Sequence, residues 1–163
     1  MLSTLKACAQ QVNQPSWGLG GPHDAGSYCM WPHQTGFFHH HGNWSSAYGK
    51  FFLQWYSDTL LRHADAVAAT ASQVMAGTGV GLSVKIPGIH WWFNTAAHGP
   101  ELTAGYYHTC QRDGYLPLFK ALQQYDVGLH LSMGEMRNLE QSPQVRPHTG
   151  VSLLQPVLVN RCS

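Results

Sequence analysis

The chain has few charged residues for its length. Only 10% of its 163 residues are charged, with nine Lys and Arg against eight Asp and Glu. Basic and acidic residues are balanced in number, and the basic residues do not cluster in the sequence. Such a chain is not expected to form the basic surface that binds nucleic acids or anionic membranes. We therefore expect a neutral ligand, and neither a nucleic acid nor a membrane as a partner.

Long apolar runs and closely spaced cysteines are also missing. No run of 18 apolar residues occurs, so a membrane-spanning helix is not expected. The four cysteines include no Cys-x-x-Cys pair, and they lie far apart at Cys8, Cys29, Cys110 and Cys162. This spacing favours reduced thiols in an intracellular protein, in plastid or cytosol, over a disulfide framework.

A spaced set of metal ligands is lacking as well. The histidines at 39–41 are consecutive, and consecutive residues do not easily converge on one ion. No His, Cys or carboxylate at a suitable spacing accompanies them. We therefore expect no metal site at these histidines.

The residues that are present predict a globular α/β chain. Apolar residues make up 44% of the sequence and aromatic residues 12%, which is enough for a packed core. Residues 3–12 resemble the end of a helix, and a loop rich in Gly, Pro and aromatic residues follows to about Trp44. A long helix can start after Ser45 or Ser46 and stop near Gly77, since its apolar residues recur at steps of three and four.

Two strands are expected further along the chain. Leu82, Val84 and Ile86 alternate with Ser83 and Lys85, and residues 127–133 alternate apolar Val, Leu, Leu and Met with Gly128, His130 and Ser132. A helix that begins near Pro100 and a second helix from Leu116 to Tyr125 separate them. Strand, helix and strand in this order predict a parallel pair. Polar residues near the strand ends predict a site there, in a (β/α)8 barrel or in a doubly wound sheet.

One strand leads directly into a segment suited to carbohydrate. After Val84 and Lys85 the chain continues with Ile-Pro-Gly-Ile and then His90, Trp91 and Trp92. Indole rings can cover the apolar faces of sugars while Lys and His donate to hydroxyl groups. The alternative is that the two indoles belong to the core.

Several ordered motifs decide between these alternatives. The segments 88–92 (Gly-Ile-His-Trp-Trp), 101–107 (Glu-Leu-Thr-Ala-Gly-Tyr-Tyr), 112–115 (Arg-Asp-Gly-Tyr) and 134–137 (Gly-Glu-Met-Arg) closely resemble the β-amylase family. The resemblance extends from about Leu5 to about Gln141. It implies a partial (β/α)8 TIM-type barrel, roughly the middle third with about two parallel strands and flanking helices.

The resemblance also implies a substrate and its contacts. β-Amylases are 4-α-D-glucan maltohydrolases that release maltose from the non-reducing ends of α-1,4-glucans such as starch and maltodextrin. Lys85 and His90 match positions that hold glucose hydroxyls, and Ser132 stands where a mobile inner loop usually has threonine. His130 replaces an asparagine and Gly134 a larger apolar residue, and Glu135 matches a carboxylate outside the catalytic pair.

The catalytic pair of the family has no counterpart among these residues. Inversion at the anomeric carbon requires two carboxyl groups, one as acid and one as base. The glutamates Glu101, Glu135 and Glu140 lie in neither of the family's two catalytic motifs, so we name no catalytic residue and expect no activity from this chain alone. The alternatives are a non-catalytic glucan-binding or regulatory truncated relative, and a product of gene-model error.

The resemblance suggests a division of the chain. We expect an incomplete β-amylase barrel domain at residues 1–141 and a divergent tail, disordered or mis-spliced, at residues 142–163. Two strands with flanking helices leave sheet edges unpaired. We therefore expect the isolated chain to fold poorly or to aggregate.

Overall fold

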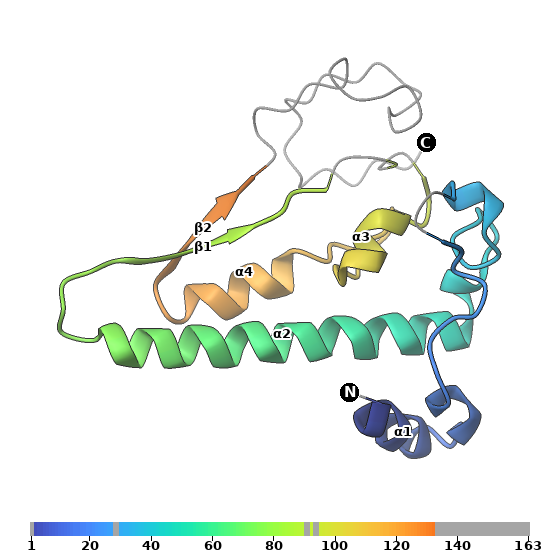
Figure 1. Cartoon of the computed structure of the whole chain (residues 1–163), viewed down its shortest axis with the longest axis horizontal. Helices are drawn as coiled ribbons and strands as arrows, with labels where there is room; N and C mark the ends of the chain where they lie inside the picture. The colour runs from blue at the N-terminus through green and yellow to red at the C-terminus, as the bar shows by residue number, and fades with distance from the viewer. Residues whose placement is uncertain (1, 28–29, 90–91, 93–94, 133–163) are drawn as a thin grey trace, which may run out of the picture. The chain divides into compact units, whose positions relative to one another are not determined.

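The computed structural model describes residues 2–27, 30–89, 92 and 95–132 (Figure 1). The chain divides into two compact units, residues 1–58 and 59–163. The boundary between the two units falls within one long helix.

The first unit begins with helix α1 (Leu2–Gln11), which buries Leu5 and Ala9. Three short 3-10 helices follow at Pro15–Gly18, Pro32–Gln34 and Asn43–Ser45, where the sequence predicted a loop. The first of them packs closely on α1, because a Cβ atom at Gly18 would lie 2.8 Å from the Cα of Lys6. Only glycine permits this approach.

The long helix α2 (Ala47–Met75) starts as the sequence predicted. Of the two candidate caps, Ser46 is the one used, since its Oγ accepts a hydrogen bond from the Gly49 N–H at 3.0 Å. This bond satisfies one of the free amides at the helix start. Past the helix end, Gly77 has a φ of +78°, a conformation that glycine adopts at little cost.

The apolar stripe predicted along α2 is only partly buried. Ala68 is buried, whereas the side chains of Val67 and Val74 on the same helix are 53% and 71% exposed. Both valines belong to the apolar residues that recur along this helix, and both are exposed. Helical periodicity locates an apolar face, but the face is buried only where another element packs on it.

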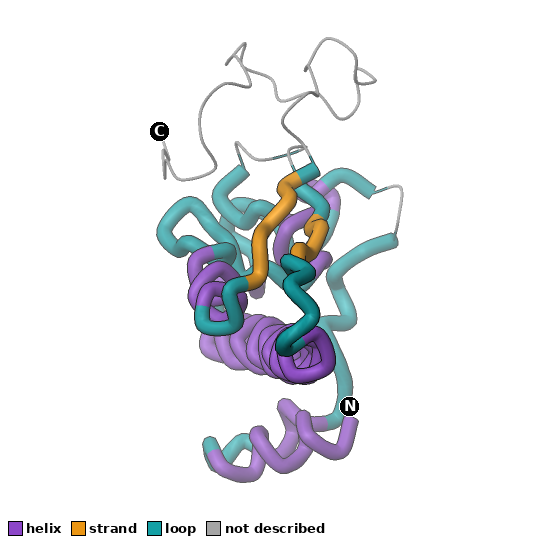
Figure 2. Tube along the Cα trace, turned by 90° about the vertical axis from the view of Figure 1, so that its left-hand side faces the viewer, coloured by secondary structure: helices purple, strands orange, loops and turns teal. Residues whose placement is uncertain are grey.

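The second unit contains the predicted pair of parallel strands, which lie side by side in Figure 2. Strand β1 (Leu82–Ile86) pairs with β2 (Val127–Leu131) over five residues, from Leu82 opposite Val127 to Ile86 opposite Leu131. Helices α3 (Gly99–Ala104) and α4 (Leu116–Gln123) connect them. The α/β class and the parallel orientation are confirmed.

Two predicted boundaries differ from those observed. Strand β2 ends at Leu131, and Ser132 lies in the turn that follows, while Met133 lies outside the described residues. Helix α4 ends at Gln123, two residues earlier than predicted. Beyond its end, Gln124 and Tyr125 both donate hydrogen bonds to the carboxylate of Asp65 on α2, at 2.6 and 3.0 Å.

Two of the four cysteines lie in the described ranges. Cys8 and Cys110 are free thiols, and Cys29 and Cys162 lie outside the described residues. Within these ranges, no helix is both long enough and apolar enough to cross a bilayer.

Candidate functional site

The exposed face of the two-stranded sheet brings Lys85, a predicted substrate contact, beside His130. Ser83 and Lys85 are exposed on β1, and Gly128 and His130 are exposed on β2. Lys85 pairs with His130 in the strand register. Register partners in adjacent strands project from the same face about 4.8 Å apart, so the Lys85 and His130 side chains leave the same face of the sheet near the carboxyl ends of both strands.

Ser132 extends this site past the end of β2. Its backbone N–H and its Oγ both donate to the carbonyl oxygen of Ile86, each at 3.2 Å. A hydroxyl group has one hydrogen to donate and two lone pairs that can accept. The Ser132 side chain therefore joins the two strand ends and still has the capacity to accept a hydrogen bond from a ligand.

His90, the third predicted substrate contact, lies outside the described residues, as do Trp91 and Gly134. Ile89 is buried, and its neighbours Pro87 and Gly88 follow β1 directly. The described part of this loop thus links Lys85 to the position just before His90.

The structure also contains a buried polar cluster. This cluster was not predicted from the sequence. It consists of His98 and Glu101 at the start of α3, together with His108 and Tyr115. Glu101 is only 4% exposed. Its Oε2 lies 2.6 Å from His98 Nδ1, and its Oε1 accepts a hydrogen bond from the Tyr115 hydroxyl at 2.8 Å.

The protonation states of the cluster follow from burial. Burial, reinforced by the charge of Glu101, raises the pKa of the Tyr115 phenol far above its usual value. Tyr115 therefore keeps its proton at any physiological pH. Burial lowers the pKa of His108, and the neighbouring carboxylate of Glu101 opposes this shift only in part. His108 is consequently neutral near pH 7.

The cluster is a hydrogen-bonded network rather than a metal site. Ligand atoms of His98, Glu101 and His108 lie within 4.8 Å of one another. However, the Gly114 N–H donates to His108 Nδ1 at 3.1 Å, so the hydrogen of the neutral ring is on Nε2 and neither nitrogen offers a free lone pair. A histidine that binds a metal normally donates its second N–H to an acceptor instead.

Glu101 cannot act as a catalytic acid or base in this arrangement. Both of its oxygens are hydrogen-bonded, one to His98 and one to Tyr115, and its side chain is buried. Glu135 and Glu140 lie outside the described residues. Within the described part of the chain, Glu101 thus serves as a hydrogen-bond acceptor for its neighbours.

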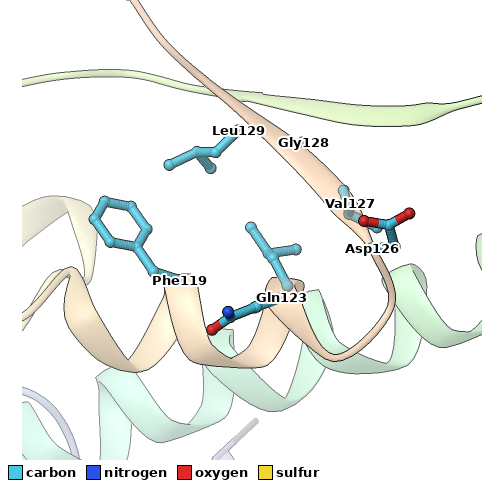
Figure 3. A pocket seen from close by; sticks show the side chains of 7 residues that line it. Phe119, Gln123, Asp126, Val127, Gly128 and Leu129 are labelled. Atoms are coloured by element: carbon cyan, nitrogen blue, oxygen red, sulfur yellow. The ribbon is translucent and has the colours of Figure 1, made fainter.

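A separate hollow of about 210 Å³ lies between α4 and β2 (Figure 3). Its lining is mainly apolar, from Phe119, Leu122, Val127 and Leu129, with the carboxylate of Asp126 at one side. Val127 and Leu129 alternate with His130 along the strand. The hollow therefore lies on the opposite face of the sheet from Lys85 and His130.

The low pKa of His108 predicts a pH-dependent stability. The unfolded chain binds a proton at His108 near the usual pKa of about 6.5, whereas the folded chain binds it only at lower pH. The free energy of unfolding should therefore decrease as the pH falls from about 6.5 to the lower pKa of His108 in the folded chain. Above about pH 6.5, His108 should contribute no pH dependence. Urea titrations at several pH values from 7.5 to 5 measure this slope.

His108→Asn is the matched control for this prediction, because it keeps an acceptor for the Gly114 N–H and cannot gain the proton. We expect the slope below about pH 6.5 to be smaller in the variant. Equal slopes in the two proteins would assign the pH dependence to other groups.

Comparison with known proteins identifies the family. The sequence matches Glycosyl hydrolase family 14 over residues 2–160, and the chain belongs to this family. It is 47% identical over 150 residues to Beta-amylase 2, chloroplastic, of Oryza sativa subsp. japonica, covering 90% of this chain and 27% of that protein. The resemblance to β-amylases predicted from the motifs is confirmed.

Two further relatives are also similar to most of this chain over only part of their own length. Beta-amylase 1, chloroplastic, of Arabidopsis thaliana is 48% identical over 141 residues, which is 86% of this chain and 24% of that protein. The Beta-amylase of Glycine max is 43% identical over 137 residues, which is 84% of this chain and 27% of that protein. The chain thus spans about a quarter of the length of these relatives.

Proposed function

We propose that this chain is the glucan-binding part of a β-amylase-like 4-α-D-glucan maltohydrolase, an enzyme that releases maltose from the non-reducing ends of starch. The main support is the juxtaposition of Lys85 and His130, with Ser132 beside them, at the carboxyl ends of two parallel strands. Sites of α/β folds form at this end of the strands. The relatives named beta-amylase support the choice of reaction.

In this proposal the two strands belong to a (β/α)8 barrel, of which the chain forms roughly the middle third. Residues 1–141 are the barrel segment and residues 142–163 a divergent tail. The exposed sheet face with Lys85 then points into the mouth of the barrel, and the apolar face packs on the helices, as Val127 and Leu129 do toward α4.

The substrate contacts follow from donor and acceptor chemistry. The Lys85 ammonium donates to glucose hydroxyls, and Ser132 accepts from one while its own hydrogen remains on Ile86 O. His90 is a third contact, proposed from the sequence alone. The partner is a neutral α-1,4-glucan, and no metal or cofactor takes part.

The alternative is a glucan-binding or regulatory relative that does no chemistry. It is favoured by the state of Glu101, whose oxygens are both engaged in hydrogen bonds. In either case these 163 residues hold glucan without cleaving it.

Glucan binding without hydrolysis is the expected result for the purified chain. To keep it soluble, the chain is joined to a carrier protein that has no tryptophan and no affinity for glucans. We expect calorimetry to show saturable binding of maltoheptaose, and we expect no maltose in the solution after prolonged incubation with starch. The carrier alone is the control for both measurements.

Either measurement can refute the proposal. Failure to bind maltoheptaose would remove the glucan-binding function. Steady release of maltose by the pure chain would show that it contains a catalytic pair after all, and would make it a complete hydrolase.

A further inference from the structure

His130 lies directly opposite Lys85, near the carboxyl ends of the two strands. The aliphatic residues of β2 are half-buried, whereas His130 is exposed on the other face of the strand. The register pairs it with Lys85, and paired residues of adjacent strands lie about 4.8 Å apart. A ligand group that Lys85 binds at this face is therefore close enough to contact the imidazole as well.

Both side chains are accessible to a ligand. The positions two residues earlier on the same face are Ser83 and Gly128, which are also register partners. A Cβ atom added at Gly128 would lie 3.6 Å from the Cβ of Ser83, so this part of the face carries only one small side chain. Within the described residues, the side chains of Lys85 and His130 make no hydrogen bond, ion pair or ring contact.

Lys85 can satisfy only the oxygen of a sugar hydroxyl and not its hydrogen. The ammonium group has three N–H donors and no acceptor, whereas a hydroxyl group both accepts and donates. Ser132 can accept a hydrogen, but it lies past the end of β2. A neutral imidazole has one N–H donor and one nitrogen lone pair, so His130 supplies an acceptor directly opposite the ammonium.

We propose that His130 is a further glucan contact, whose ring nitrogen accepts the hydrogen of a glucose hydroxyl that itself accepts from the Lys85 ammonium. This inference rests on the proposed glucan-binding function and adds a residue to that site. Linked hydrogen bonds polarise one another, so a hydroxyl that donates to His130 accepts more strongly from Lys85. The pair thereby favours hydroxyl groups over ether or anionic oxygens, which have no hydrogen to donate.

His130→Leu and His130→Asn test the acceptor role. Calorimetry is carried out at about pH 8, above the range in which histidine usually gains a proton. Leucine removes the acceptor, so the dissociation constant for maltoheptaose should rise about three- to ten-fold. Asparagine keeps a neutral acceptor in its amide oxygen and should bind within about two-fold of the parent.

His63→Leu is the matched control, because His63 is an exposed histidine on α2. This variant should bind maltoheptaose as the parent does. Since His63 and His130 are both exposed, the urea midpoints of all these variants should stay close to that of the parent. A loss of affinity confined to His130→Leu would then report a lost contact and not a lost fold.

A double variant tests whether Lys85 and His130 bind the same hydroxyl. Independent contacts would make the loss of affinity in Lys85→Met/His130→Leu the product of the two single losses. A shared hydroxyl predicts a smaller loss, no more than about two-fold beyond that of Lys85→Met alone. A loss equal to the product would overturn the shared contact.

NMR of the imidazole nitrogens separates direct contact from an indirect effect. The His130 resonance is identified by its absence from the spectrum of His130→Asn, and it should shift when maltoheptaose is added to the parent. If it does not shift and His130→Leu binds as the parent does, while Lys85→Met loses binding, the role of His130 is wrong and glucan binding stands. If the parent itself does not bind maltoheptaose, the proposed function fails and the His130 contact is overturned with it.

Discussion

Glu101→Ala is expected to lower the free energy of unfolding by about 2–6 kcal/mol, because it removes the acceptor that two hydrogen bonds in the protein interior share. The substitution leaves His98 Nδ1 and the Tyr115 hydroxyl without the acceptor that both now use. Each buried polar group left unsatisfied costs about 1–3 kcal/mol. Since whole domains are stable by only about 5–15 kcal/mol, much of the stability depends on this carboxylate.

Urea unfolding at pH 7.5, followed by the fluorescence of the six tryptophans, measures this loss, since the carrier has none. Asp58→Ala is the matched control: its carboxylate also accepts a hydrogen bond, from Gln54 at 2.7 Å, but is exposed on α2. We expect that variant to change stability by no more than about 0.5 kcal/mol. Equal unfolding midpoints for the two variants would show that the Glu101 network contributes nothing.

Glu101→Gln tests how much of the stability depends on the charge of the carboxylate, because glutamine has nearly the same shape as glutamate. The amide keeps an oxygen that can accept from Tyr115, but its nitrogen cannot accept from His98. We expect a smaller loss than for Glu101→Ala, because one of the two bonds survives. The comparison therefore divides the contribution of Glu101 between its two partners.

The sheet and its polar face could be predicted because their signal is periodic. Side chains alternate along a strand, and the aliphatic residues of both strands were expected to face the helices, so Lys85 and His130 were expected on the other face. The register that pairs them directly was not predictable, since it depends on how the connecting helices fit. The same limit applies to Val67 and Val74, whose periodicity indicated a face but not its exposure.

The buried cluster could not be predicted because loop geometry assembles it. His98 has a φ of +50°, and an antiparallel bridge between Thr109 and Arg112 folds the chain back toward it. Glu101 and Tyr115 are 14 residues apart in sequence and share no periodic pattern. The only available signal was that both lie in motifs of the family resemblance, which indicated importance but gave no contact.

Lys85→Met is expected to raise the dissociation constant for maltoheptaose about 10- to 100-fold. Hydrogen bonds to a charged donor contribute about 1.5–3 kcal/mol, and each 1.4 kcal/mol corresponds to about ten-fold in affinity. Methionine keeps the length and apolar stem of the side chain, so the loss reports the ammonium group. Lys120→Met, at an exposed lysine on α4, is the control and should bind as the parent does.

Salt dependence identifies what the Lys85 ammonium binds. A neutral glucan has no charge to be screened, so raising NaCl from about 50 to about 500 mM should change the dissociation constant by less than about two-fold. A ligand held as an anion would bind much more weakly at the higher concentration. If Lys85→Met and Lys120→Met instead bind maltoheptaose equally well, Lys85 is a surface lysine whose stem covers the sheet, and glucan contact must be assigned to other residues.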